Sequence, residues 1–544
     1  MKKTLALLLV LVMSMGISGL HASAGEPSTL NLNWKQAGGT DTQFECPWVD
    51  IQCLLSYMIF DTLIKLEPDG TTVVPALAQS LDISDDGLTY AFTLVEGVKW
   101  HDGAPFSAED VLFSFNVSAI EPSSYITPRL APVQGVQDYL DGKADAISGI
   151  TADGNKVTVT LDTPDNSLIA DVFTQFCILP KHLLENVDPT LLSRDEAYWK
   201  KPVGTGVYKL DQVSFPNYCT AIRNDDYFGP KAKIDTVTFT SYEVGGIEAY
   251  TAALIAGNLD FAYGNDINDI ARAQNIVAQN PDVKMLIVPS TYQRQFWFNN
   301  TESADGKYNP DMQKKEVRQA FDLLIDKETV ASFYAGQAVS LSTFVNPDFP
   351  AYNTSIPLFQ RDVEKGKQML EEAGFDFNRP VRLLYYYDDS TTADIMELLK
   401  QNFAEAGVKL EPFLAAGDLA SQIYELKNYD FMYVGYGGSD PVLVYTLYIP
   451  DGGIMDGLFG DVEFRAETLG SLLSDYKSVV DTVEKKKIGD QIQLEAGQYA
   501  LALAVYGMNQ IIVYNTASLR FDESIYNTDL LGVNRKFYDW ELVK

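Results

Sequence analysis

The first third of the chain alternates apolar and polar residues in short runs. The segments TLNLNWK (29–35), TYAFTLVEG (89–97) and KVTVTLD (156–162) show the two-residue period of half-buried β-strands. The turn sequences EPDG, SDDG and ADGN lie between such runs. This pattern predicts a strand-rich region that is punctuated by tight turns.

From about residue 310 the pattern changes to an alternation of helices and strands. Val317, Phe321 and Leu324 stand at helical spacing and predict a helix within 314–336. Gly374 and Gly407 suit the left-handed residue that follows the last turn of a helix. The segments downstream predict, in order, a helix (361–374), a strand (379–388), a helix (392–407), a strand (408–414), a helix near 417–427 and a strand (429–437).

This alternation predicts the α/β fold class with a largely parallel sheet. In such sheets, ligands bind beyond the carboxyl ends of the strands. The last predicted strand, YDFMYVGYG, is followed by Gly438, Ser439, Asp440 and Pro441. We therefore expect this segment to lie at the ligand-binding edge of the sheet.

The stretch VKWHDGAPFSAED (98–110) brings an imidazole and three carboxylates together, from His101, Asp102, Glu109 and Asp110. Such a cluster could serve acid–base chemistry or hold a metal ion. Ser107 and Asp110, however, have the spacing of a capping box, in which a hydroxyl and a carboxylate satisfy backbone N–H groups at the start of a helix. We interpret the stretch as a strand–turn–helix junction, and hence as framework.

The N-terminus has the features of a secretory signal peptide. Two lysines precede the apolar run Leu5–Met13, and Ala22-Ser23-Ala24 offers a cleavage site after Ala24. The run is too short for a membrane span of ~20 residues, and no other stretch comes close. We expect residues 1–24 to be removed on export, and because no cysteine lies near the cut, we expect no lipid anchor.

The charge composition argues against some classes of binding partner for the exported chain. The net charge is −33, and the signal removes two lysines and no acid, which leaves −35. This balance argues against nucleic acid or an anionic membrane surface as partner. The remaining 520 residues suffice for two to four units with substantial cores.

Four cysteines are present at positions 46, 53, 177 and 219, and none forms a C-x-x-C pair. Export favours disulfides over metal sites. Cys46 and Cys53 could close a short loop, and Cys177 and Cys219 could close another. The sequence leaves all three possible pairings open.

The sequence lacks the common catalytic motifs. The exported chain keeps only His101 and His182, and the zinc motif H-E-x-x-H, the nucleophile elbow G-x-S-x-G and the P-loop are all absent. The segment Gly204–Lys209 begins like a dinucleotide fingerprint, but a lysine replaces its third glycine. We therefore expect a protein that is not an enzyme and that carries no metal and no cofactor.

Aromatic residues gather in two segments. One is TYQRQFWFNN, with Tyr292, Phe296, Trp297 and Phe298, and the other surrounds GYGGSDP, with Tyr433, Tyr436, Tyr445 and Tyr448. The ordinary interpretation of any one ring is that it belongs to the core. Rings beyond a strand end also suit peptide side chains or the faces of sugars.

Several of these segments resemble the family 5 extracellular solute-binding proteins, which are dipeptide-, oligopeptide- and nickel-binding receptors of ABC importers. The resemblance is carried by residues 61–115, by KPVGTGVYKL (201–210) and by RNDDYFGPKAKIDTVTF (223–239). It continues in AALIAGNLDFAYG (252–264), FWFNN (296–300), the segment 314–339 and DVEKGKQMLEEAGF (362–375). It implies the two-lobed periplasmic-binding-protein fold, of type II and of the large class with an extra subdomain in lobe I. The lobes would close over a ligand and present it to a membrane permease.

Mapped onto this sequence, the resemblance implies the following organisation. Lobe I spans about 25–285 and 512–544, and its extra subdomain spans about 55–165. Lobe II spans about 286–511. The chain would cross between the lobes near VKMLIVPS (283–290) and QIIVYN (510–515), both of which are strand-like and suit a hinge.

The resemblance also suggests ligand-binding residues. In peptide-binding relatives, an aspartate after a strand end in lobe II pairs with the α-ammonium of the peptide, and here Asp440 is the available acid. The family position of that acid falls slightly earlier, at Ser439 or Gly438, and Asp440-Pro441 also suits a plain turn. The other candidates are Arg294 (for a peptide carboxylate, or in a surface ion pair), Trp48 (in the early part of lobe I) and the rings of Trp297, Tyr433 and Tyr436.

The first functional hypothesis is a monomeric periplasmic receptor for short peptides. An alternative keeps the receptor architecture but binds oligosaccharides by stacking on Trp297 and Tyr436. A chemosensory ligand presenter would share the fold, and a secreted hydrolase is a more distant alternative. Nickel is the least expected ligand, because His101 and His182 fall at framework positions.

Overall fold

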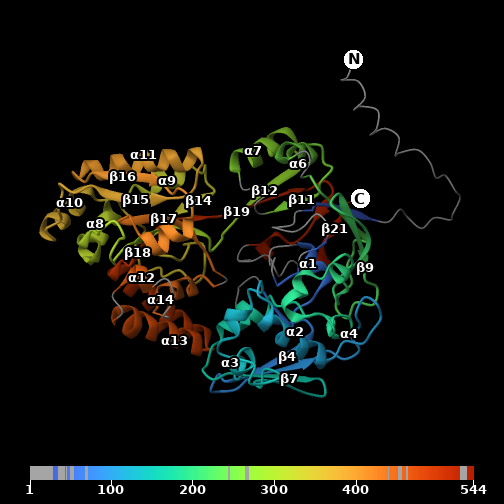
Figure 1. Ribbon diagram of the computed structural model, residues 1–544. Helices are drawn as coiled ribbons and strands as arrows, with labels where there is room; N and C mark the ends of the chain where they lie inside the picture. Colours follow the sequence, from blue (N-terminus) through green and yellow to red (C-terminus); the bar gives the residue numbers. More distant parts are fainter. Residues whose placement is uncertain are drawn as a thin grey trace.

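The computed structural model shows a protein built on two large β-sheets, which lie in separate halves of Figure 1. The predicted signal peptide, Cys53 and Ser439 lie outside the residues that the structure describes. These described residues are 28–34, 43–44, 46–48, 54–67, 72–242, 246–263, 269–438, 440–450, 456–460, 463–526 and 536–543.

The first sheet has seven strands, and its buried face forms a large core with residues such as Leu32, Phe239 and Tyr514. The predicted strand at 29–35 is confirmed as the central strand β1. The strand order is β12 (Val283–Val288), β19 (Gln510–Asn515), β11 (Phe261–Tyr263), β1 (Thr29–Asn33), β10 (Thr236–Thr240), β9 (Tyr218–Arg223) and β8 (Tyr208–Ser214).

A smaller antiparallel sheet contributes side chains to the same hydrophobic core. It contains the predicted strands at 89–97 and 156–162, in the order β4 (Ala78–Ile83), β5 (Thr89–Leu94), β7 (Lys156–Thr160) and β6 (Ile150–Asp153). Helix α2 (Ala108–Ile120) begins at Ser107, whose backbone N–H donates to Asp110 Oδ2 at 2.8 Å. The predicted capping box is therefore confirmed.

The second large sheet has six strands, in the order β14 (Ala338–Ser340), β18 (Ala502–Met508), β13 (Gln293–Phe298), β17 (Phe431–Tyr436), β15 (Val381–Tyr385) and β16 (Leu410–Leu414). Strands β17, β15 and β16 run parallel to one another, whereas β13 pairs antiparallel with both β17 and β18. The expectation of a largely parallel sheet was wrong for the half formed by β14, β18 and β13, whose pairings are antiparallel. The reason is that β13 and β18 come from outside the strand–helix repeat.

Helices cover both faces of this sheet. Phe296 and Phe298 of β13 pack with α8 (Lys315–Leu324), α10 (Val363–Glu372) and α11 (Ser390–Glu405). Trp297 packs on the other face, in a cluster with α13 (Ser471–Ser478) and α14 (Thr482–Tyr499). Gly374 and Gly407 have positive φ after α10 and α11, as predicted. The predicted helix within 314–336 is interrupted, because Asp326 caps a new helix, α9 (Lys327–Ser332).

The remaining elements are short and connect the three sheets. Within the described residues, no helix is long and apolar enough to cross a membrane. These elements are α1 (Leu54–Ile59), α3 (Val136–Leu140), α4 (Lys181–Leu184), α5 (Glu196–Trp199), α6 (Gly246–Ile255), α7 (Ile270–Gln279), α12 (Asp456–Phe459), β2 (Ile64–Leu66), β3 (Val73–Pro75), β20 (Leu519–Arg520) and β21 (Glu541–Leu542).

The chain passes between the two large sheets twice, once after β12 and once before β19. These two strands are antiparallel neighbours, with Val288 opposite Gln510. The fold is therefore two-lobed α/β. The exact lobe boundaries stay a prediction.

Cys177 is a buried thiol outside any disulfide. The suggested pairing of Cys177 with Cys219 is therefore wrong. A pairing of Cys46 with Cys53 is not tested, because Cys53 lies outside the described residues.

Candidate ligand-binding site

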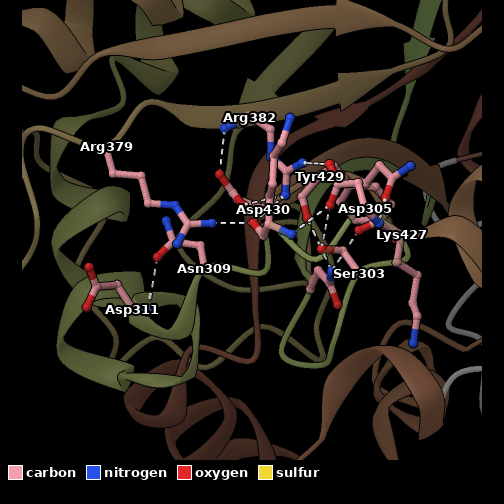
Figure 2. A network of polar contacts seen from close by, with 12 residues as sticks. Ser303, Asp305, Asn309, Asp311, Arg379, Arg382, Lys427, Tyr429 and Asp430 are labelled. Carbon is pink, nitrogen blue, oxygen red and sulfur yellow. Dashed lines mark hydrogen bonds and ion pairs between the residues drawn. The ribbon is translucent and has the colours of Figure 1, made fainter.

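A dense network of charged and polar side chains lies at the amino ends of β15 and β17 (Figure 2). Arg382 Nη1 pairs with Asp305 at 2.7 Å, and Arg382 Nη2 pairs with the buried Asp430 at 3.3 Å. Asp430 Oδ2 also accepts the Arg382 backbone N–H at 2.7 Å. Arg382 therefore bridges the two carboxylates, and the network holds the strands and the loop around residue 305 together.

A different arrangement surrounds Arg294, near the carboxyl end of β17. Arg294 lies opposite Gly435 in the β13–β17 register. Its guanidinium carbon lies 3.6 Å from the ring centroid of Tyr387 and 5.2 Å from that of Tyr292. Its Nη1 donates to the Tyr292 hydroxyl at 2.5 Å. This guanidinium is therefore stacked among tyrosine rings.

No carboxylate pairs with Arg294 among the described residues. Its Nε is buried and has no hydrogen-bond partner in the described part of the chain. The interpretation of Arg294 as part of a surface ion pair was therefore wrong. A desolvated cation without a counter-charge is costly, and a ligand carboxylate or another anion would relieve that cost.

Gly435 makes room for this arrangement. A Cβ at position 435 would overlap Arg294 Nη1 and the hydroxyls of Tyr292 and Tyr387. The guanidinium and both hydroxyls therefore rest directly on the backbone of β17.

The predicted aromatic candidates are divided between the two faces of the sheet. Tyr433 lies on the face of Arg294, fully buried, with its hydroxyl 2.5 Å from that of Tyr506. Trp297 lies on the other face, is 5% exposed, and donates through Nε1 to Gln295 Oε1 at 2.8 Å. Tyr436 is half-buried on that same face. Of the three rings, only Tyr436 has surface to offer a ligand.

Asp440 already has partners within its own segment. Its Oδ1 accepts the backbone N–H groups of Val442 at 2.7 Å and Leu443 at 3.2 Å. These bonds are those of a plain turn, which the Asp440-Pro441 sequence also suits. The Tyr476 hydroxyl donates to Oδ2 at 3.2 Å, and Lys485 Nζ lies 4.0 Å away. Its role as an ammonium anchor stays a prediction.

Trp48 is a core residue of the first lobe. Its side chain is fully buried, Nε1 donates to the Cys177 carbonyl at 2.8 Å, and its ring stacks on Phe176 with centroids 5.1 Å apart. The Trp48 carbonyl accepts the backbone N–H of Tyr125 at 3.1 Å.

Two residues that sequence reasoning missed, Arg129 and Asp171, interact electrostatically with Tyr436 and Asp440. The charges of Arg129 and Asp171 act on Tyr436, and the charge of Asp440 acts on Asp171. The one sequence signal was the presence of an acid, Asp171, inside the apolar run LIADVF.

The two lobes also meet through a direct polar contact beside these residues. Asn166 donates its backbone N–H to the Lys477 carbonyl at 2.6 Å and its side-chain amide to the Val479 carbonyl. Asp165 pairs with Lys477 Nζ at 3.2 Å, and Lys485 Nζ donates to Asn166 Oδ1 at 3.2 Å. The turn between α13 and α14 is thereby joined to residues 165–166.

The two histidines belong to the framework. Burial lowers the pKa of His101 to about 4, and its Nε2 lies 3.0 Å from the Gly206 carbonyl. His182 Nε2 lies 2.8 Å from Asp102 at the turn before α2. In the part of the chain that the structure describes, no group of three or more His, Cys, Asp or Glu side chains is arranged to hold a metal ion.

Residues 72–453 match the family described as bacterial extracellular solute-binding proteins, family 5. This match covers more than half of the chain. The chain belongs to that family.

Individual relatives agree with this assignment. A protein of Brucella ovis whose name describes an ABC transporter peptide-binding protein is 27% identical over 357 residues, which are 65% of this chain and 62% of that protein. The dipeptide-binding protein of Escherichia coli is 26% identical over 414 residues, 72% of this chain and 70% of its own length. The match thus spans less than two thirds of the Brucella protein.

A solved structure supports the fold over nearly the whole length. The oligopeptide-binding protein AppA of Bacillus subtilis, in complex with a nonapeptide, superposes with a TM-score of 0.65 at 21% identity. The superposition covers 95% of this chain and 100% of that chain. The two-lobed fold is therefore that of the family.

Proposed function

We propose that this protein is the extracytoplasmic receptor of an ABC importer, and that it captures short peptides between its two lobes and delivers them to a membrane permease. The observation that carries the proposal is the family match over residues 72–453, together with relatives named for peptide and dipeptide binding. The free positive charge of Arg294 beside the carboxyl end of β17 supports it, because every unmodified peptide carries a carboxylate.

In this proposal lobe I comprises about 25–285 and 512–544, with its extra subdomain at about 55–165, and lobe II comprises about 286–511. Tyr436 and the segment that contains Ser439 and Asp440 contribute the lobe II contacts. Arg294 binds the carboxylate of the peptide. The protein acts as a monomer in the periplasm, without a lipid anchor, and does not transform its ligand.

Thermal shift of the exported form, residues 25–544, tests the ligand class. A tripeptide library should stabilise the protein, because a ligand that binds only the folded state adds RT ln(1 + [L]/Kd), about 2.7 kcal/mol at a hundredfold excess over Kd. An oligosaccharide panel serves as the matched control. Stabilisation by the sugars and not by the peptides would overturn the proposal, and so would cleavage of either ligand class during the assay.

A further inference from the structure

Two buried polar atoms without partners lie in the first lobe, on the side that faces the second. They are the hydroxyl of Tyr125 and Oδ1 of Asp171, and neither has a hydrogen-bond partner among the residues that the structure describes. The charge of Asp171 acts on the Tyr125 hydroxyl, so the two groups share one environment. Buried polar groups are almost always hydrogen-bonded, and two unpaired groups together indicate a missing ligand group.

The position of Asp171 follows from its neighbours in the chain. Asp171 lies in the helical turn Ile169–Phe173, five residues after Asn166. Asn166 is hydrogen-bonded to the turn between α13 and α14 of the second lobe. The turn that carries Asp171 is therefore anchored where the lobes meet.

Two residues of the second lobe, Tyr436 and Asp440, interact electrostatically with Asp171 in the turn Ile169–Phe173. Tyr436 is half-buried at the end of β17, and the charges of Arg129 and Asp171 act on it. The segment after Tyr436 continues to Asp440, whose charge acts on Asp171. Asp171 of the first lobe thus lies within electrostatic range of Tyr436 and Asp440 of the second lobe.

The other charges near Asp171 are already engaged. Asp165 pairs with Lys477, and Asp440 accepts two backbone N–H groups and the Tyr476 hydroxyl. Arg129 donates to the Tyr125 carbonyl and lies 5.1 Å from the centroid of the Tyr125 ring, and it forms no ion pair with Asp171. Asp171 is therefore the carboxylate of this group that is left without a partner.

We propose that Asp171 and the Tyr125 hydroxyl bind a protonated primary amine of the ligand, opposite Tyr436. An ammonium group has three donors, and Asp171 Oδ1 and the Tyr125 oxygen offer two acceptors. The rings of Tyr125 and Tyr436 add favourable faces for a cation. The proposal deepens the proposed function, on which it rests, and it assigns the α-ammonium of a peptide to the first lobe.

The test compares binding of two tripeptide libraries, one with free amino termini and one N-acetylated, by the wild type and by Asp171→Asn. The substitution is isosteric, so the fold should survive, and thermal unfolding without ligand checks this. We expect Asp171→Asn to weaken the free-amine library roughly ten- to a hundredfold and to leave the acetylated library unchanged. Tyr125→Phe should weaken the free-amine library by a smaller factor.

Asp162→Asn is the matched control, because Asp162 is an exposed acid of the same lobe whose side chain forms no ion pair or hydrogen bond with any described residue. It should leave both libraries unaffected. Equal losses for both libraries in Asp171→Asn, or no loss in either, would overturn the inference and leave peptide binding intact.

A second arm separates this inference from the proposed function. Alaninamide and putrescine carry amines but no peptide carboxylate, and their effect on the melting temperature of both proteins is measured. Suppose that no peptide binds but that these amines stabilise the wild type and not Asp171→Asn. The proposed amine site is then supported, and the proposed function of peptide capture is overturned. If neither peptides nor amines act on the wild type, both proposals are overturned.

Discussion

The guanidinium carbon of Arg294 lies 3.6 Å from the centroid of the Tyr387 ring, which comes from the loop after β15. A desolvated cation over an aromatic face gains about 2 kcal/mol, so the stack fixes the guanidinium at the edge of the sheet. The stack leaves the charge of Arg294 without a counter-ion within the described protein. A cation held in this way is pre-organised for an anion.

Arg294→Lys should weaken binding of a free tripeptide by roughly tenfold or more. Lysine keeps the charge but loses the planar fork that matches a carboxylate and stacks on Tyr387. Isothermal titration with a tripeptide and with its C-terminal amide measures the effect. The loss should be confined to the free acid, and Arg272→Lys, at a surface ion pair of the other lobe, should change neither affinity. Equal losses for acid and amide would remove Arg294 from carboxylate binding.

Gly435→Ala should destabilise the second lobe by about 1–3 kcal/mol. The new Cβ would overlap Arg294 Nη1 and the Tyr292 and Tyr387 hydroxyls, and these side chains pack on β17 and have little space to retreat. Thermal unfolding measures the loss. Gly438→Ala is the control, since the nearest atom to its new Cβ would be the Asp440 carbonyl oxygen at 3.8 Å. Similar melting temperatures for both variants would contradict the close approach at Gly435.

The pH dependence of stability should differ between the wild type and Asp171→Asn. Burial raises the pKa of Asp171 to about 7, against the ordinary value of about 3.9. A raised folded-state pKa means that the folded protein binds the proton more tightly. Its stabilising contribution is complete below about pH 4 and is lost as the pH rises through 7.

The wild type should therefore lose roughly 1–3 kcal/mol of stability relative to Asp171→Asn between pH 4 and pH 8. Arg129, Asp440, Asp165 and Lys477 are the charged groups that act on Asp171, and they are unchanged in the variant. Urea denaturation at a series of pH values measures the difference. Parallel stability curves would show that folding does not raise the pKa of Asp171.

Asn166→Ala should lower the stability of the whole protein by about 1–2 kcal/mol. It removes the side-chain contacts to the Val479 carbonyl and to Lys485 Nζ and spares the backbone contact to Lys477. Chemical denaturation followed by tryptophan fluorescence measures the change. The control is Asn186→Ala, since Asn186 is exposed and has no side-chain partner among the described residues. An effect no larger than that of the control would show that the interlobe contact contributes nothing to stability.

Local features of the fold could be predicted because their causes lie within a few residues. Ser107 and Asp110 form a cap three residues apart, and Gly374 and Gly407 end helices through their own φ angles. The strand at 429–437 follows from its own periodicity. None of these features depends on a distant partner.

The site was harder to predict because it depends on residues that are far apart in the sequence. Whether Arg294 is paired depends on what lies beside Gly435 and on Tyr387, which is 93 positions away. Trp297 was expected to stack on a ligand, but β13 directs its side chain into a helix-covered core. Asp171 could not be predicted as a site residue, because its sequence neighbours do not show whether an acid faces the other lobe or the solvent.

The pairing of β12 with β19 has a mechanical consequence. Val288 lies opposite Gln510, so both chain crossings leave the first lobe from one point at the edge of its sheet. Two connections that start side by side form a single pivot, which permits rotation and resists sliding of one body past the other. The contact of Asn166 with Lys477 in α13, which lies away from β12 and β19 in Figure 1, acts on a long lever arm. A single hydrogen bond there can oppose a torque that would require several near the pivot.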